Sequence, residues 1–390
     1  MDFALPAPIL ERKLTARRFV DETCIPLERE LEPDWIELPP ELHRQLEAQI
    51  RALGLWAVGV PRELGGEGMG ALGYTAIREE QCRTVIGTSH YTPFGGELPA
   101  PLYFASEEQK ARYVLPILRG EKKVAFAQTE PGAGSDAAAI ETRAVRDGDG
   151  WRLSGVKRFA TLADRADVLL VVAVTDPEKR ARGGITMFLV DRDTPGLRVH
   201  RILKVLRPQH STEIVLDNVF VPQSNVLGEV GQGFAMAQKF LVRGRMSIAA
   251  RCLGVARRAL EMSLAYARER HTFGQPLAER QAVQWMLADS YMEWHAARLL
   301  TYETAWKEDQ GHDPRVEASE VKCFATEMAF RVLDRAIQVH GGIGLTKDLP
   351  LERWFREIRV LRIGEGPNEI HRWVVARSLL RGQLVPGQPW

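Results

Sequence analysis

The residue best suited to proton transfer is Glu365, which stands in the segment Gly364-Glu365-Gly366-Pro367-Asn368. Glycines on both sides and the following proline place this glutamate outside regular helix, because proline disfavours helical backbone in the residue before it. A carboxylate that projects from such a bend between two helices could act as a general base. The alternative is a solvated glutamate, or one that caps the next helix.

A glycine-rich segment, T-E-P-G-A-G-S-D at positions 129–136, follows an apolar stretch at 124–127. Successive backbone N–H groups in such a turn can point at one anion, and the hydroxyls of Thr129 and Ser135 add donors without adding charge. A diphosphate or the edge of a flavin would fit there. The segment is neither a Walker A loop nor a G-x-G-x-x-G fingerprint, so a purely structural turn stays the alternative.

Two further segments stand at the ends of expected helices. E-R-H-T-F-G at 269–274 carries Arg270, which is positioned to bind a phosphate or a carboxylate; the alternative is an ordinary cationic helix C-terminus. Q-V-H-G-G at 338–342 is most simply a helix stop.

The elements that must position these segments begin with short helices. Positions 8–119 have helical spacing, as Leu42, Leu46, Ile50 and Leu53 illustrate, and prolines and glycines divide the stretch. A helical N-terminal region follows from this pattern.

A different hydrophobic period marks the middle of the chain, from 124 to 226. Runs rich in Val, Ile, Leu and Phe predict strands there, including 168–174, 185–190 and 214–216. The sequence D-G-D-G at 147–150 predicts a hairpin turn between two strands. We therefore expect a β domain of about one hundred residues.

The C-terminal part returns to helical spacing. One long helix fits 233–270, and two more stretches free of proline and glycine cover 280–310 and 315–340, the last closed by Gly341-Gly342. Shorter helices fit 351–363 and the stretch through His371 to Leu380. Long amphipathic helices of this kind predict an antiparallel bundle.

Composition excludes several classes of protein. Lys and Arg total 52 against 51 Asp and Glu, and a net charge of +1 offers no general attraction to nucleic acid or an anionic membrane. The longest strictly apolar run, 168–174, is too short for a membrane span, and the N-terminus lacks the charge order of a secretory signal. No metal site is predicted, because the cysteines have no metal-ligand spacing and are expected as buried thiols in a reducing cytoplasm. These are Cys24, Cys82, Cys252 and Cys323.

Taken together and in this order, the segments resemble the acyl-CoA dehydrogenase family over nearly the whole chain, to about residue 381. The most specific parts are 128–136, 269–274 and the run from 338 to 372. The resemblance implies an α+β fold: an N-terminal α-helical domain at 1–120, a middle β-barrel or β-sandwich domain at 121–230, and a C-terminal four-helix bundle at 231–390.

The resemblance also implies roles for individual residues. Glu365 matches the catalytic base, and Arg245 matches an arginine near the substrate and the base. Substrate-binding positions would be Ser135, Arg245, Gly364, Glu365 and Gly366. Positions matching FAD contacts are Phe126, Gln128, Thr129, Gly134, Ser135, Phe159, Thr161, Arg270, Thr272, Phe273, Gln338, Gly341 and Gly342.

The implied reaction converts an acyl-CoA thioester to trans-2-enoyl-CoA in fatty acid β-oxidation. A base removes the Cα proton, hydride leaves Cβ for flavin, and electrons pass to an electron-transferring flavoprotein. FAD would lie between the β domain and the bundle, with part of its site contributed by a neighbouring subunit. A homotetramer is expected, and at least a dimer.

Several positions depart from the common family pattern. Phe159 stands where tryptophan is frequent, and Gly364 replaces a common aromatic, which predicts a more open pocket. Pro367 stands where a hydroxyl residue is frequent and Glu369 where glutamine is frequent, so the family's contacts to the FAD adenine cannot be carried over to these two positions. The G-P-N-E-I-H wording at 366–371 resembles the subgroup around human acyl-CoA dehydrogenase family member 11, although the base there is often aspartate.

Two other functions are weighed against the dehydrogenase. A flavin monooxygenase or oxidase on the same fold is disfavoured by the intact base at Glu365. A non-catalytic DNA-binding flavoprotein is disfavoured by the balanced charge. Acyl chain length stays open, although Gly95 and Gly96 suggest room for a long or bulky tail.

Overall fold

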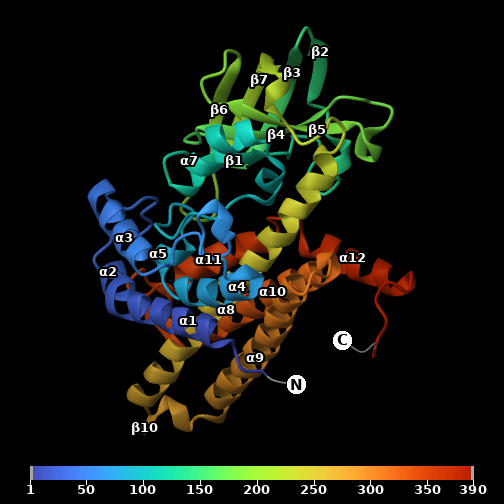
Figure 1. Ribbon diagram of the computed structural model, residues 1–390. Coiled ribbons are helices and arrows are strands. Elements are labelled where there is room, and N and C mark those ends of the chain that lie inside the picture. Colours follow the sequence, from blue (N-terminus) through green and yellow to red (C-terminus); the bar gives the residue numbers. More distant parts are fainter. Residues whose placement is uncertain (1–2, 388–390) are drawn as a thin grey trace. The chain divides into compact units, whose positions relative to one another are not determined.

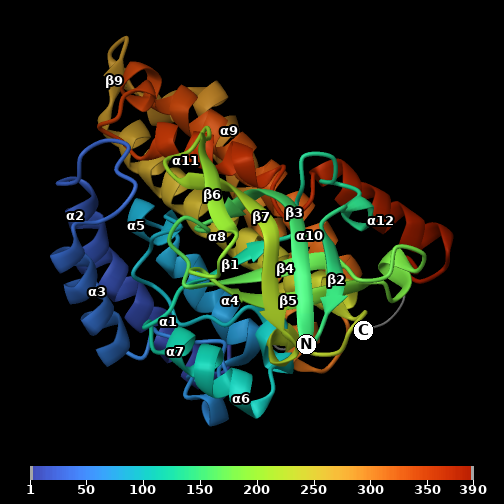
Figure 2. The same ribbon diagram turned by 90° about the horizontal axis from the view of Figure 1, so that it is seen from above.

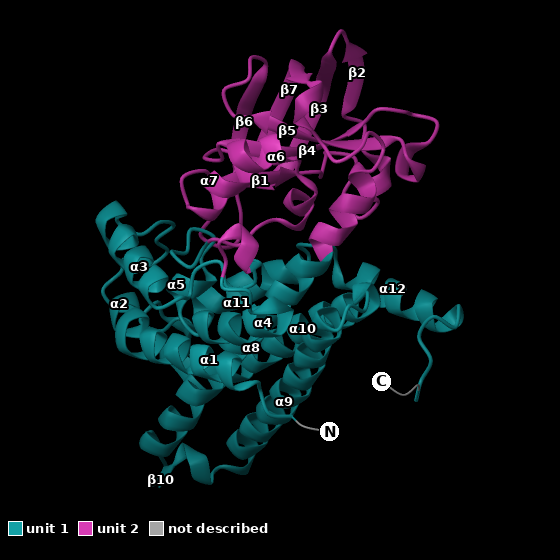
Figure 3. Ribbon diagram, viewed as in Figure 1, with its two compact units in different colours: residues 1–61, 67–95, 242–390 teal, residues 62–66, 96–241 magenta. Residues whose placement is uncertain are grey.

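The computed structural model describes residues 3–387, which form two compact units (Figure 3). Unit 1 contains the chain up to residue 61, residues 67–95 and the chain from residue 242 onward; unit 2 contains residues 62–66 and 96–241. The predicted domain limits after residues 120 and 230 stay a proposal. Residues 1–2 and 388–390, at the outer limits of two of those domains, lie outside the described residues.

The first helices of unit 1 confirm the helical character expected at the N-terminal end. In α3, Pro40 stands in the first turn, where a missing N–H costs no hydrogen bond, and Leu46 and Ile50 are buried on one face. The helices are α1 (Ala7–Phe19), α2 (Ile25–Glu28), α3 (Pro40–Ala52), α4 (Gly70–Gln81) and α5 (Val85–Thr88).

Unit 2 is built on one eight-stranded sheet with the order β6-β7-β3-β2-β4-β5-β8, and β1 pairs with β4 (Figure 2). The first four strands are β1 (Val124–Ala127), β2 (Arg143–Asp147), β3 (Gly150–Thr161) and β4 (Val168–Val174). The last four are β5 (Ile185–Asp191), β6 (Leu197–Lys204), β7 (His210–Pro222) and β8 (Val226–Leu227). Two short helices, α6 (Glu107–Gln109) and α7 (Leu115–Leu118), precede β1.

The strand patterns have direct physical causes. Every residue of β4 is buried, so both faces of this strand are covered, which explains its unbroken apolar sequence. Asp147 pairs with Gly150 at the end of the β2–β3 ladder, which confirms the predicted hairpin. The predicted middle β domain is confirmed as a sheet domain.

Strand β3 carries an irregularity that exposes an aromatic ring. Its pairing with β7 shifts register between Lys157 and Ala160, and Phe159 within this bulge has φ = 57°. Bulges redirect side chains at functional edges of sheets. The Phe159 ring is 56% exposed as a result.

The C-terminal helices confirm the predicted bundle (Figure 1). They are α8 (Gly233–Glu269), α9 (Gln281–Asp309), α10 (Arg315–His340), α11 (Leu351–Leu361) and α12 (Asn368–Leu380), with a small hairpin of β9 (His271–Thr272) and β10 (Gln275–Pro276) after α8. α10 ends at Gly341, whose φ of 62° suits a residue without a Cβ.

One apolar core joins α8, α9, α10 and α11 within unit 1. Ala256 of α8, Ala297 of α9, Met328 of α10 and Trp354 of α11 belong to the same buried cluster. Four helices therefore share a single interior, which is the arrangement expected of a four-helix bundle. Between residues 3 and 387, no helix combines the length and apolar character needed to cross a bilayer.

Replacing Trp354 with alanine should lower the free energy of unfolding by about 3–5 kcal/mol, because the ring is completely buried in this core. The measurement is the midpoint of urea unfolding at unchanged slope. Trp373→Ala on α12 is the control: its ring is 55% exposed, and the expected change is below about 0.5 kcal/mol. Equal losses in both variants would contradict the assigned core.

Candidate active site

Glu365 lies in the turn between α11 and α12 and has a left-handed backbone conformation. Its φ is 57°, and that of the following Gly366 is 96°. A left-handed conformation is uncommon for a residue with a side chain and costs energy that the surroundings must supply. The predicted bend between two helices is confirmed.

The carboxylate of Glu365 is enclosed but unpaired. The residue as a whole is half-buried, yet its Oε2 is inaccessible to solvent and has no hydrogen-bond partner. Oε2 faces the backbone of Gly244 on α8, where an added Cβ would lie 2.9 Å from it. Oε2 therefore neither contacts solvent nor caps a helix, and it has no hydrogen-bond donor of its own.

Burial and the neighbouring charges act in opposite directions on the proton affinity of Glu365. Burial raises the pKa of the Glu365 carboxyl, and the cations Arg245 and Lys322 partly offset this rise. Burial also lowers the pKa of Arg245, against the favourable charge of Glu365. A carboxylate with a raised pKa is better matched to accept a proton near neutral pH.

Two side chains hold the main chain at Glu365. Arg245 Nε donates to the carbonyl oxygen of Glu365 at 3.4 Å, and His371 Nε2 lies 3.2 Å from the same oxygen. Burial, together with the nearby Arg245 and Lys322, lowers the pKa of His371 to about 3. His371 is therefore neutral, with its proton on Nε2, and it donates to the carbonyl.

Sequence reasoning missed both His371 and Lys322. Lys322 lies on the buried face of α10 at helical spacing with Ala318, Ala325 and Ala329, and a lysine in such an apolar row was the available signal. His371 is the last residue of the G-P-N-E-I-H stretch, but the sequence gives no sign that its ring bonds the Glu365 carbonyl. Sequence reasoning also overestimated the space at Gly95, where an added Cβ would lie 2.7 Å from the Trp56 ring.

In unit 2, the glycine-rich segment is fastened by a buried ion pair. Lys157 Nζ donates to the Gln128 carbonyl at 3.0 Å and to Glu130 Oε1 at 2.7 Å. Glu130 in turn accepts from the backbone N–H groups of Glu141 and Thr142. These bonds fix one end of the segment, and its exposed tip carries Gly134 and Ser135.

The remaining predicted residues of unit 2 lie on β1, on β3 and in the segment that follows β1. Phe126 on β1 packs against Phe240, with ring centroids 4.5 Å apart. The backbone carbonyl of Thr129 accepts from the Arg158 backbone N–H at 2.8 Å, which ties the segment to the strand carrying Phe159. Thr161 is the last residue of β3.

The predicted residues of the E-R-H-T-F-G and Q-V-H-G-G segments lie far from Glu365. Arg270 follows α8 twenty-five positions after Arg245, which corresponds to roughly 38 Å along a helix axis. Phe273 in the β9–β10 hairpin is 97% exposed with φ = 50°. One chain therefore does not bring this group to its own base. The group contains Arg270, Thr272, Phe273, Gln338, Gly341 and Gly342.

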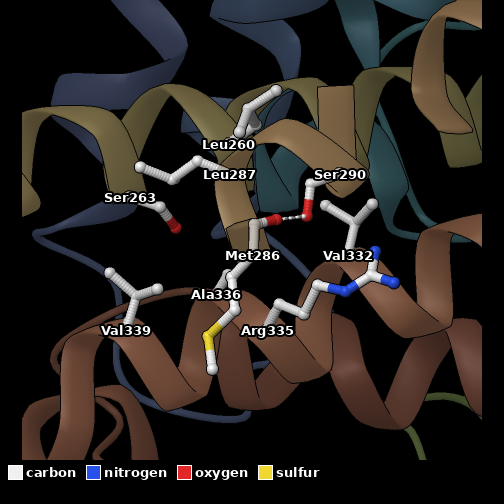
Figure 4. Close-up of a pocket in the computed structure, with 9 residues that line it drawn as sticks. All are labelled: Leu260, Ser263, Met286, Leu287, Ser290, Val332, Arg335, Ala336 and Val339. Carbon is white, nitrogen blue, oxygen red and sulfur yellow. Dashed lines mark hydrogen bonds between the residues drawn. The ribbon is translucent and has the colours of Figure 1, made fainter. Parts of the chain in front are cut away.

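A small hollow lies between α8, α9 and α10 (Figure 4). Its two hydroxyls are used within their own helices: Ser290 donates to Met286 O at 2.6 Å, and Ser263 donates to Ala259 O at 2.8 Å. Its one charged group, Arg335, is paired with Glu293. The candidate active site of unit 1 is therefore the surroundings of Glu365.

Three family models match the chain in order. They describe the acyl-CoA dehydrogenase N-terminal domain at residues 11–121, middle domain at 125–219 and C-terminal domain at 231–380. The chain belongs to the acyl-CoA dehydrogenase family. Members of this family are FAD-dependent oxidoreductases, so the predicted family, enzyme class and cofactor are confirmed. The resemblance to the subgroup around family member 11 stays a prediction.

Similar acyl-CoA dehydrogenases and reductases are found in several bacteria. The (R)-benzylsuccinyl-CoA dehydrogenase of Thauera aromatica is 42% identical, over 97% of each chain. The caffeyl-CoA reductase-Etf complex subunit CarC of Acetobacterium woodii is 36% identical, over 89% of this chain and 93% of its own. The structure of butyryl-CoA dehydrogenase from Megasphaera elsdenii superposes with a TM-score of 0.88 at 32% identity, covering 98% of this chain and all of the other.

The residues of unit 2 fit the cofactor of the family. Gln128 Nε2 is enclosed without a hydrogen-bond partner, and the exposed Phe159 ring offers a face for stacking. Gly134 has no atom within 4 Å of an added Cβ, so its backbone is open to close approach. A planar ring with polar edges and a phosphate tail matches this set of donors and surfaces.

Gly244→Ala should reduce kcat by roughly 10-fold or more while the fold is retained. The added methyl lies too close to Glu365 Oε2 and displaces the carboxylate, and small displacements of reacting groups are costly. Alanine is also the better helix former, so thermal stability should not fall. Steady-state kinetics, flavin content and the melting temperature are measured together. Unchanged kcat would show that the carboxylate does not act from this position.

Proposed function

We propose that the protein removes the Cα proton and the Cβ hydride of an acyl-CoA thioester, forming the trans-2-enoyl-CoA. The observation that carries this proposal is the enclosed, unpaired Oε2 of Glu365, held opposite Gly244 beside Arg245. Glu365 takes the proton at Oε2, and exclusion of water by a bound acyl chain increases its basicity. When bound, FAD supplies the hydride acceptor.

The other predicted residues have supporting roles in this proposal. Gln128, Thr129, Gly134 and Ser135 hold the cofactor and the thioester from the fastened segment, with Phe126, Phe159 and Thr161 against the ring. Gly364 and Gly366 provide backbone around the substrate. The alternative weighed from sequence, a flavin monooxygenase or oxidase, is not needed to explain an enclosed general base at Glu365.

The acyl group is proposed to be bulky or aromatic. Gly364, directly before the base, has no left-handed φ, and an added Cβ would meet only Val360 O at 3.7 Å. A larger side chain would therefore fit the backbone, yet the position is left empty. The names of two relatives point the same way, since one acts on benzylsuccinyl-CoA and one on caffeyl-CoA. This widens the proposal beyond straight-chain fatty acid β-oxidation.

Electrons are proposed to leave to an electron-transferring flavoprotein in the cytoplasm, as the name of the CarC relative suggests for its own complex. The protein is proposed to act as a homotetramer, and at least as a dimer. The distance along α8 between Arg245 and Arg270 supports this, because the Arg270 group would then serve the FAD of another copy.

Glu365→Gln should slow flavin reduction by about 10²–10⁴-fold, because a neutral amide cannot accept the Cα proton. The rate of flavin reduction is measured as anaerobic bleaching of the flavin absorbance with excess acyl-CoA. In the wild type, kcat/KM should fall as pH drops through the raised pKa of Glu365, which then becomes protonated. Glu178→Gln on an exposed loop is the control and should behave as wild type. Equal bleaching in all three proteins would reject the proposed base.

Gly364→Phe should lower kcat/KM for 3-phenylpropionyl-CoA by roughly 10-fold or more relative to butyryl-CoA, because the new ring occupies the space left by glycine. The ratio of the two specificity constants is the measurement, since it cancels general losses of active enzyme. A ratio identical to that of the wild type would show that the acyl tail does not pass this position.

A further inference from the structure

Lys322 on α10 is a completely buried amine directly behind the turn that carries Glu365. Its Nζ donates to Gly366 O at 2.7 Å and to Asn368 Oδ1 at 3.0 Å. The first acceptor belongs to the turn itself, and the second belongs to the first residue of α12. A single ammonium group therefore joins α10 to both sides of Pro367.

Asn368 extends this contact into a network on α10. Its Nδ2 donates to Thr326 Oγ1 and to Glu327 Oε1, each at 3.0 Å. Arg362, at the end of α11, donates to Glu327 at 3.0 Å and accepts from the Asn368 backbone N–H at 3.1 Å. Both ends of the turn are thus bonded to the same stretch of α10.

This network stabilises an unfavourable backbone conformation in the turn. Glu365 and Gly366 have consecutive left-handed backbone conformations, and a non-glycine residue adopts that state only when its surroundings impose it. Loss of Lys322 would leave the Gly366 carbonyl and the Asn368 amide oxygen without their buried ammonium donor. Thr326 Oγ1, 3.3 Å from the Asn368 amide oxygen, is then its remaining donor, and this loss of buried donors is costly and favours rearrangement of the turn.

Lys322 also contributes charge. The titratable groups acting on Glu365 are Arg245 of α8 and Lys322 of α10, and the third neighbour, His371 of α12, is neutral. Burial raises the pKa of the thiols nearest Lys322, Cys252 and Cys323, which are therefore uncharged. Burial lowers the pKa of Lys322 to about 8, so the amine is still mostly protonated at neutral pH.

We propose that Lys322 is a positioning residue for the base: it holds the turn of Glu365 and Gly366 in its left-handed form, and its charge stabilises the ionised carboxylate. This inference rests on the proposed function of Glu365 but concerns a different residue. Lys322 touches the turn and not the reacting atoms, so its effect passes entirely through the position and ionisation of Glu365.

The test compares Lys322→Met with Lys13→Met. Lys13 is another buried lysine of unit 1 that bonds Glu79, Glu80 and Tyr302 instead of the turn, so it controls for general destabilisation. Hydrogen exchange of peptides covering residues 362–370, measured by mass spectrometry, should quicken about 10-fold or more in Lys322→Met alone. The acid limb of kcat/KM should move up by about one pH unit, with a lower kcat and little change in KM.

Two further variants separate position from charge and serve if Lys322→Met does not fold. Lys322→Gln keeps a donor without the charge and should move the acid limb with a smaller effect on exchange. Thr326→Val keeps the charge but weakens the hold on Asn368, and it should quicken exchange with the acid limb unchanged.

Wild-type exchange and an unmoved acid limb in the Lys322 variants would overturn the inference, as would identical changes in Lys13→Met. Failure of the proposed function has a different signature. In that case Glu365→Gln bleaches normally, while the exchange comparison, which needs no substrate, still reports whether Lys322 holds the turn.

Discussion

The structure depends on keeping one carboxylate enclosed and unpaired. An ionised carboxylate taken out of water without partners is strongly disfavoured, and it usually becomes protonated or finds a hydrogen-bond donor. Here the nearest cations, Arg245 and Lys322, donate hydrogen bonds to backbone and amide oxygens around Glu365. Their charge therefore favours the ionised carboxylate while its Oε2 remains available. Arg245 and Lys322 therefore stabilise the ionised Glu365 carboxylate without hydrogen-bonding to its Oε2.

Both units use a buried lysine in the same way. In unit 2, Lys157 bonds the Gln128 carbonyl and Glu130, and in unit 1, Lys322 bonds the Gly366 carbonyl and Asn368. In each case one ammonium joins a main-chain oxygen of an irregular segment to a polar side chain nearby. Irregular backbone lacks the regular bonds of helices and strands, so its buried carbonyls need such donors. The segments that carry functional groups are thereby made rigid.

Glycines, which have no side chain, shape the candidate site as much as larger residues do. Gly244 gives the Glu365 carboxylate the space it occupies, whereas the space beside Gly364 has no neighbouring side chain against it. Gly95 shows why glycine alone is a poor guide to a cavity, since the Trp56 ring lies where its side chain would be. Whether a missing Cβ leaves room depends on which distant segment folds against it.

The sequence by itself determined the family, the cofactor class, the order of helical and sheet regions, and the place of Glu365 in a bend. These follow from local information: hydrophobic period, turn residues and motifs whose letters are contiguous. Only the tertiary structure decided that Oε2 is enclosed opposite Gly244 and that His371 and Lys322 support the turn. Burial, charge and hydrogen-bond partners arise between residues distant in the chain, so no local pattern could predict them.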